Sequence, residues 1–200
     1  MSIERKVQLV ESLFSKLEQE TAQFEQSSVL TCVSGCGKCC TQPNIEASPI
    51  EFLPWAFHLF LNGEAEKTFI QLKKNQNSTC IIYKPLAIIN QGRCSNYKYR
   101  GLICRLFGFA ANTDKYGNLR LATCKIIKEG QADNYSSTSE AITKGLYVPV
   151  FTEYYMQLNQ IDFNLGNIIL PINKALKMAL EEVLQFYAYR PFLHLGKKCG

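Results

Sequence analysis

Hydrophobic residues recur every three or four positions near both ends of the chain. At the N-terminus this spacing predicts an amphipathic helix over residues 2–27, with Glu and Lys on its other face. Its apolar face is formed by Ile3, Val7, Val10, Phe14, Leu17, Thr21 and Phe24. Near the C-terminus the same spacing predicts a helix that Pro171 opens and that ends at about residue 188. Its apolar face is formed by Ile172, Leu176, Ala179, Leu180, Val183 and Leu184.

Two shorter helices are predicted between these ends. Residues 48–51, Ser-Pro-Ile-Glu, have the order of a capping box and predict a helix over residues 49–62. Pro54 lies inside that helix and can kink or shorten it, because proline lacks the backbone N–H. A further helix is predicted over residues 64–75.

The middle of the chain predicts short strands and turns. They are a strand at residues 80–83, a turn at Gln91-Gly92, one helical turn at 100–106, a turn at 115–118 and a strand at 119–124. Residues 137–140 then have the Ser/Thr and Glu content of a helix start, and predict a helix to residue 159 that is interrupted near Pro149.

Composition and charge exclude several classes of protein. A hydrophobic content of 46% argues against disorder, and no apolar run approaches the ~20 residues that span a bilayer. The net charge of +5 is a mild excess without blocks of like charge, so we expect no nucleic-acid partner. The N-terminus lacks the apolar run of a secretory signal, so we expect a cytoplasmic protein without membrane association.

Cysteine is the residue that carries chemistry. Eight of the nine cysteines are candidate ligands: Cys32, Cys36, Cys39, Cys40, Cys80, Cys94, Cys104 and Cys124. Cys199 lies alone near the C-terminus. In a reducing compartment such clusters bind metal or act in catalysis, whereas in a secreted protein the eight could form four disulfides. We favour a metal or iron–sulfur site.

The spacing of the thiols allows one or two centres. Cys36 and Cys39 have the C-x2-C spacing that lets two thiolates reach one metal, as zinc or iron–sulfur ligands. Neighbouring side chains diverge, so Cys39 and Cys40 suggest two centres, or one centre beside a reactive thiol. We expect Cys36 and Cys39 to share a centre with two of the four later cysteines. His58 and His194 do not lie at ligand spacing.

Basic residues lie close to these cysteines in sequence. They are Lys38, Lys84, Arg93, Arg105 and Lys125. They could offset the charge of about −2 that a tetrathiolate centre carries, or they could be scattered surface charges.

The elements and the cysteines together predict an α+β fold that is mostly helical. We expect a small irregular cysteine-rich metal-binding core with short strands, packed by N- and C-terminal helices. The predicted parts are an N-terminal helix (1–29), an eight-cysteine metal- or iron–sulfur-binding domain (30–126) and a C-terminal helical extension (127–200).

The cysteine pattern also matches a known array. Cys32 with residues 36–40 forms a C-x3-C-G-x-C-C loop, and Glu51 follows in a predicted helix. The later matching positions are Cys80, residues 92–97, residues 100–107 and Cys124. This pattern resembles the YkgJ-like cysteine-cluster family, CxxCxxCC, a zinc- or iron-chelating domain. The chain departs from it in the three-residue first gap and in Gly101, where proline is usual. The resemblance implies metal or iron–sulfur binding and no established reaction.

The sequence leaves three hypotheses for the function. The first is an iron–sulfur cluster protein with a redox or maturation role, an iron–sulfur oxidoreductase if it is an enzyme. The second is a zinc-binding structural or interaction module without catalysis. The remote third is a radical S-adenosylmethionine enzyme, whose cluster loop has the spacing of Cys32, Cys36 and Cys39.

Aromatic residues in the C-terminal helices give the only hint of a partner. They are Tyr154, Tyr155, Phe186, Tyr187 and Tyr189. They could dock a protein partner, although packing in the core is the favoured interpretation.

Overall fold

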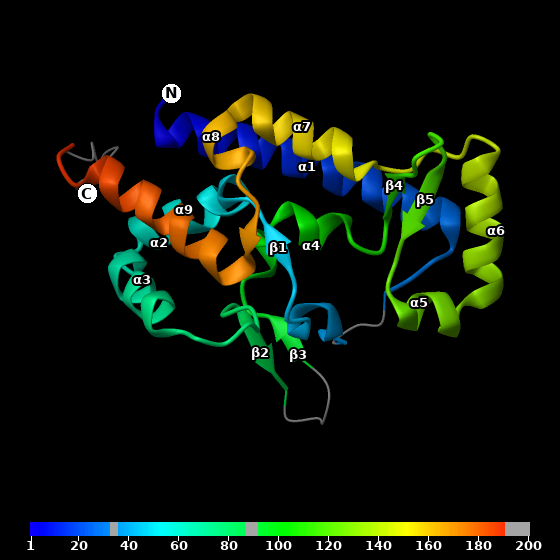
Figure 1. Cartoon of the computed structure of the whole chain (residues 1–200), viewed down its shortest axis with the longest axis horizontal. Coiled ribbons are helices and arrows are strands. Elements are labelled where there is room, and N and C mark those ends of the chain that lie inside the picture. The colour runs from blue at the N-terminus through cyan, green and yellow to red at the C-terminus, as the bar shows by residue number, and fades with distance from the viewer. Residues whose placement is uncertain (33–35, 87–91, 191–200) are drawn as a thin grey trace, which may run out of the picture.

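The computed structural model describes residues 1–32, 36–86 and 92–190. In this part the chain is mostly helical with short paired strands, as predicted (Figure 1). The α-helices are α1 (Ile3–Ser28), α2 (Leu53–Leu61), α3 (Ala65–Lys74), α4 (Leu102–Leu106), α5 (Lys125–Gly130), α6 (Ala132–Thr143), α7 (Phe151–Ile161), α8 (Phe163–Gly166) and α9 (Ile172–Tyr187). Three 3₁₀ helices are η1 (Lys38–Thr41), η2 (Pro49–Phe52) and η3 (Tyr97–Tyr99).

The strands form three antiparallel pairs in the described residues. They are β1 (Glu46–Ala47) with β6 (Leu170–Pro171), β2 (Tyr83–Pro85) with β3 (Gly92–Cys94), and β4 (Ala110–Thr113) with β5 (Leu119–Ala122). None of these sheets is the repeated parallel strand arrangement on which the radical S-adenosylmethionine alternative depends.

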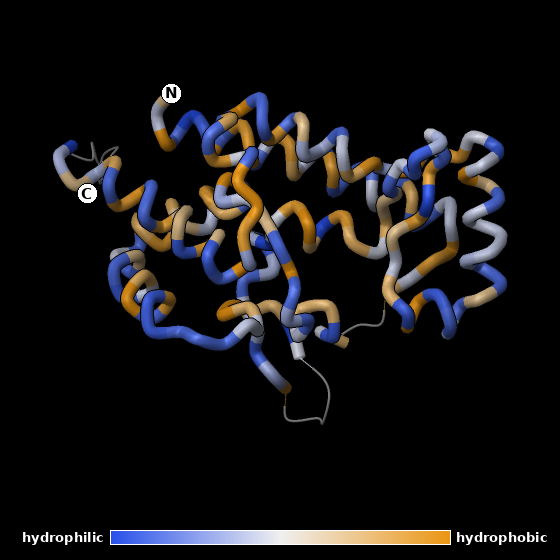
Figure 2. Tube along the Cα trace, in the orientation of Figure 1, coloured by the Kyte–Doolittle hydropathy of each residue, from blue (hydrophilic) through white to orange (hydrophobic). Residues whose placement is uncertain are grey.

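The main core is built from helices that lie far apart in sequence. Helix α2 contacts both α1 and α9, and α7 runs beside α1 (Figure 1). Leu17 of α1, Leu53 of α2 and Leu180 of α9 are fully buried in this core. Each such side chain contributes about 1.5–3 kcal/mol when it leaves water. Figure 2 shows hydrophobic and hydrophilic residues alternating along α1 and α9, so each helix keeps one face in the core.

A buried ion cluster ties three helices together. The Lys6 ammonium of α1 lies 2.7 Å from the carboxylate of Asp162, between α7 and α8, and 3.2 Å from Glu182 of α9. Lys6 is only 9% exposed, so its charge has to be paired.

A second, smaller hydrophobic cluster holds the other end of the molecule. It joins Phe24 near the end of α1, Ala111 of β4 and Ile142 of α6 with Val148. The two amphipathic helices predicted from periodicity are therefore confirmed as α1 and α9, and α1 reaches both clusters.

The predictions for residues 48–75 are largely confirmed. The capping box at residues 48–51 is formed, and it opens η2 rather than a continuous helix. The chain changes from 3₁₀ to α-helix at Leu53, and Pro54 lies in the first turn of α2, where its missing N–H costs nothing. The next predicted helix is α3.

Two predictions for the rest of the chain are wrong. The strand predicted at residues 80–83 is mostly a turn, closed by a 3.0 Å bond from the Tyr83 N–H to the Cys80 carbonyl, and β2 starts only at Tyr83. The helix predicted to start at residues 137–140 already starts at Ala132. Ser139 lies inside it and donates its hydroxyl to the Tyr135 carbonyl, so it is no N-cap.

Other predictions are confirmed in outline. The helical turn at 100–106 is α4, the strand at 119–124 is β5, and the break near Pro149 separates α6 from α7. The turn at 115–118 is closed by a bond from the Gly117 N–H to the Asp114 carbonyl. Gln91 of the predicted turn lies outside the described residues, and Gly92 belongs to β3. The boundaries at residues 29 and 126 stay a prediction.

The C-terminal aromatics divide between core and surface. Tyr154 is buried, Tyr155, Phe186 and Tyr187 pack against the main core, and Tyr189 is 96% exposed. Docking of a partner there stays a prediction. No helix in the described part of the chain has the length and apolar character needed to cross a membrane.

We expect Leu59→Ala in α2 to lower the free energy of unfolding by about 2–5 kcal/mol, because it leaves a cavity in the main core. Leu61→Ala, on the same helix but 49% exposed, should change it by no more than about 0.5 kcal/mol. Urea denaturation of the two variants measures the difference. Equal losses would contradict the placement of α2.

Candidate metal centre

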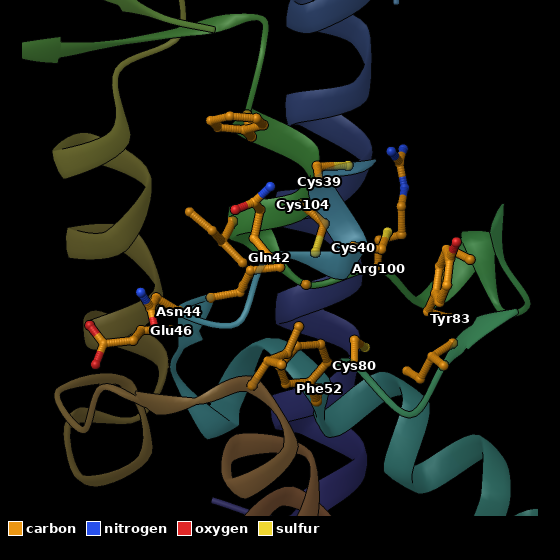
Figure 3. A pocket seen from close by; sticks show the side chains of 17 residues that line it. Cys39, Cys40, Gln42, Asn44, Glu46, Phe52, Cys80, Tyr83, Arg100 and Cys104 are labelled. Carbon is orange, nitrogen blue, oxygen red and sulfur yellow. The ribbon is translucent and has the colours of Figure 1, made fainter. Parts of the chain in front are cut away.

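Cysteines from separate parts of the chain meet at one cavity of about 270 Å³. Five of the eight candidate ligands line it: Cys39, Cys40, Cys80, Cys94 and Cys104. They come from η1, the turn before β2, β3 and α4. Figure 3 shows the labelled Cys39, Cys40 and Cys104 close to one another, with Cys80 beside Phe52 further along the cavity.

Close backbone contact places the cysteine-rich loop on the β2–β3 hairpin. Gly37 has a φ of +58°, in the left-handed region, and it opens η1. A Cβ atom on Gly37 would lie only 2.5 Å from the Gly92 carbonyl oxygen. Glycine is therefore required at this position for two reasons: its backbone conformation and the close contact with Gly92. The contact brings η1, with Cys39 and Cys40, against the strand that ends in Cys94.

The hairpin and α9 together hold Cys80. Tyr83 pairs with Cys94 across the hairpin, and the turn after Cys80 leads directly into that pair. From α9, the Asn173 amide nitrogen donates to the Thr79 carbonyl at 2.8 Å, and its oxygen accepts from the Ile81 N–H at 2.9 Å. Both neighbours of Cys80 are thus fixed by one side chain.

A buried carboxylate positions the helix that carries Cys104. One oxygen of Glu51 accepts from the Ser48 N–H at 2.7 Å and the Ser48 hydroxyl at 2.9 Å, and the other accepts from the Ile103 N–H at 3.1 Å. Glu51 is only 1% exposed. Burial raises the pKa of Glu51, while these N–H donors oppose the rise. One side chain thereby caps η2 and α4 at once.

Gly101, the departure from the family pattern, also belongs to this arrangement. It is the N-cap of α4, and a Cβ atom there would lie 2.7 Å from the Phe52 ring and 2.9 Å from the Glu51 carboxylate. The glycine permits close packing of α4 on η2, so Cys104 is held although the proline is missing.

The electrostatic environment differs from thiol to thiol. Interaction with the neighbouring Cys40 thiol, backbone N–H groups and the Arg100 charge lower the pKa of Cys39 to about 6 against the effect of burial. The pKa of Cys40 is raised by the same interaction with Cys39 and by burial. Burial raises the pKa of Cys80 to about 11 and also raises those of Cys94 and Cys104.

Among the described residues that line the cavity, Arg100 carries the positive charge, and sequence reasoning missed it. Its charge helps to lower the pKa of Cys39 and opposes the rise that burial causes for Cys94 and Cys104. Figure 3 places Arg100 beside the thiols. Of the residues predicted to offset charge, Arg105 instead bonds to Glu18 and to the Lys98 carbonyl. The sequence feature that could have identified Arg100 is its position in the segment just before Cys104.

Three candidate ligands lie outside the cavity lining: Cys32, Cys36 and Cys124. Cys124 caps α5, and its sulfur accepts from the Ile127 N–H at 3.4 Å. Within residues 1–32, 36–86 and 92–190, no three His, Cys, Asp or Glu side chains stand close enough to hold one metal ion as placed. The ligand assignment of the eight cysteines therefore stays a prediction.

His58 does not line the thiol cavity. His58 stacks on Tyr99, with ring centroids 4.7 Å apart, and contacts the Asn62 amide at 3.0 Å. His194 and Cys199 lie outside the described residues.

We expect Gly37→Ala to destabilise the protein more than Gly63→Ala. Both glycines have positive φ, which costs alanine about 1–2 kcal/mol. Only at Gly37 does the added Cβ meet another backbone, which adds about 1–3 kcal/mol, whereas Gly63 faces open space. Thermal unfolding of both variants measures the difference. Equal shifts in Tm would show that the loop does not rest on β3.

We expect Glu51→Gln to lower the free energy of unfolding by about 1–3 kcal/mol, because an amide has only one oxygen to accept the bonds from Ser48 and Ile103. Glu66→Gln, an exposed change in the first turn of α3, is the matched control and should cost less. If both variants unfold alike in urea, the double cap is contradicted.

Comparison with known proteins supports the chemistry of this site. The model of the family described as "CxxCxxCC: Putative zinc- or iron-chelating domain" matches residues 31–130, which is half of the chain. No curated protein and no solved structure matches the chain. The matched segment contains all eight candidate ligands and the whole thiol lining of the cavity. The chain belongs to the CxxCxxCC family of zinc- or iron-chelating domains.

Proposed function

We propose that this protein binds an iron–sulfur cluster at the thiol-lined cavity and serves in electron transfer or in the maturation of another protein. The observation that carries the proposal is the convergence of five thiols from four chain segments on one cavity. Cysteine thiolates are the usual ligands of iron–sulfur clusters, so the donor set fits.

The space between the thiols favours a cluster over a single ion. Four sulfurs at about 2.3 Å from one zinc ion lie about 3.8 Å from one another. The five lining thiols instead surround a cavity of about 270 Å³. Within the described residues, no three of them stand close enough together to hold a single ion. A cluster carries several irons and sulfides between its thiolates, so it needs such a space.

The rest of the lining suits a redox centre. Phe52, Ile103, Phe107 and Ile172 form apolar walls of the cavity. Arg100 supplies positive charge, which offsets the negative charge of a thiolate-bound cluster and favours its reduced form. A bound cluster would supply one-electron chemistry. The apolar walls would surround it, and Arg100 would offset part of its negative charge.

A zinc-binding structural module is the second candidate. It is favoured by the short elements around the thiols, such as the three-residue strands β2 and β3 and the four-residue η1. Segments this short gain stability from a closed four-cysteine zinc site. In either case a reducing cytoplasm would keep the thiols available for metal.

Purification without oxygen distinguishes the two candidates. We expect a brown protein with stoichiometric iron and acid-labile sulfide and with visible absorbance that bleaches on reduction. The double variant Cys80→Ser/Cys104→Ser should lose iron and sulfide, whereas Cys199→Ser should retain both. Colourless wild-type protein with stoichiometric zinc and no sulfide would contradict the cluster and favour the structural module.

A further inference from the structure

The charges of the chain are unevenly distributed along its sequence. Residues 67–113 contain eight Lys and Arg and no Asp or Glu, so the formal charge of this segment exceeds the +5 of the whole chain. The same segment contains Cys80, Cys94 and Cys104, three of the five thiols that line the cavity. The positive excess is therefore concentrated in chain segments that surround the candidate centre.

Two exposed cations lie directly opposite each other on the β2–β3 hairpin. Lys84 pairs with Arg93 in the antiparallel register. The next pair along the hairpin, Tyr83 with Cys94, lines the cavity. Because side chains alternate between the two faces of a strand pair, Lys84 and Arg93 point away from the cavity, and both are exposed. Figure 1 shows the hairpin at the lower edge of the molecule.

This cross-strand pair is unfavourable for the protein alone. Like charges that lie directly opposite each other in a strand pair are destabilising. Of the ion pairs among the described residues, none includes Lys84 or Arg93. Because the two cations face solvent, water and salt weaken their effect on the cavity. Carboxylates supplied by another molecule would replace the repulsion by attraction.

An exposed aromatic ring and a further cation follow at η3, soon after β3. The Arg100 guanidinium lies 3.5 Å from the centroid of the Tyr97 ring, and its Nε donates to the Tyr97 carbonyl at 3.3 Å. Tyr97 is 63% exposed although it is a large aromatic residue, whereas Arg100 also lines the cavity. Tyr and Arg are enriched among the residues that anchor protein interfaces, and a preformed pair loses little freedom on binding. This pair connects an exposed surface to the thiols.

We propose that Lys84, Arg93, Tyr97 and Arg100, here called the basic surface, dock an acidic protein that carries single electrons. The inference rests on the proposed function, because it names the class of partner that would reduce the cluster. One electron would pass from the reduced partner to the cluster, so the partner is oxidised, the cluster is reduced and no covalent bond changes. Arg93 adjoins Cys94 in β3, so docking on this surface would bring the donor close to a cavity thiol.

A protein fits the basic surface better than a nucleic acid does. Affinity for nucleic acid comes largely from the neutralisation of many phosphates, whereas this surface offers only Lys84, Arg93 and Arg100. Complexes that transfer electrons bury small interfaces, and complementary charge accelerates their association. A few cations beside one exposed aromatic ring meet that requirement.

Electron transfer from an acidic carrier tests the surface. Full-length protein purified without oxygen is mixed with reduced plant-type ferredoxin, a small acidic one-electron carrier, and the oxidation of ferredoxin is followed by stopped-flow absorbance at several salt concentrations. We expect Lys84→Glu/Arg93→Glu to slow the reaction by about tenfold or more at low salt, because complementary charge raises association rates by that order.

The matched control is Lys73→Glu/Lys74→Glu, which makes the same change in net charge at the exposed end of α3. Its rate should fall by less than about threefold, because salt screens charges that lie far from the interface. An equal loss in the two double variants, or a wild-type rate that does not fall as salt is added, would overturn the proposal.

A single substitution separates docking from folding. Arg93→Glu replaces like charges by opposite charges across the hairpin, so the free protein should have a higher Tm than the wild type. The same variant should accept electrons from ferredoxin more slowly, although it is better folded. A wild-type rate of electron transfer in Arg93→Glu, or a lower Tm, would contradict the role given to this pair.

Binding measured without electron transfer separates this inference from the proposed function. Calorimetric titration with ferredoxin at low salt should show binding to the wild type and weaker binding to Lys84→Glu/Arg93→Glu, whichever metal the protein holds. Zinc-bound protein that binds ferredoxin in this way would support the basic surface and contradict the cluster. Protein that holds a cluster but does not bind ferredoxin would overturn the surface and leave the cluster. Binding of a DNA oligonucleotide in place of ferredoxin would overturn the protein partner.

Discussion

The geometry of the thiol cavity depends on one buried carboxylate. Glu51 accepts bonds from Ser48 at the start of η2 and from Ile103 at the start of α4, so its two oxygens join two helix N-termini across 52 residues of sequence. The η2 end rests on the core through its contact with α9, and the α4 end carries Cys104. The helical scaffold and the cysteine-rich segments are thereby one packed unit. The absence of a side chain at Gly101 allows the two ends to approach, and the contact of Gly37 with β3 brings the loop thiols to the same place.

Burial and charge work against each other at this site. Desolvation favours the protonated forms of Cys80, Cys94 and Cys104, whereas Arg100 favours thiolate. A metal resolves the conflict, because it replaces the protons and offsets part of the negative charge of the thiolates in the same step. The cavity is therefore chemically suited to soft metals, in agreement with the zinc- or iron-chelating description of the family.

Sequence reasoning succeeded where one local rule controls the structure. The three- and four-residue spacing gave α1 and α9, the capping box at residues 48–51 formed, and the cysteine motif identified the family. It failed where local signals have two uses. The Ser/Thr run at 137–139 looked like a helix start, but Ser139 bonds back to Tyr135 inside α6. The apolar residues after Cys80 looked like a strand, but Asn173 and the β2–β3 pairing fix them as a turn. Which thiols share a cavity, and that Arg100 is their cation, depends on contacts between distant segments that spacing along the chain does not encode.

The most direct test of this account is anomalous diffraction from crystals grown without oxygen, with data collected on both sides of the iron and zinc absorption edges. The account predicts an iron signal inside the cavity, with Cys40, Cys80 and Cys104 as ligands. Metal located away from these sulfurs, or thiols that remain separated around a cavity filled only by water, would contradict it.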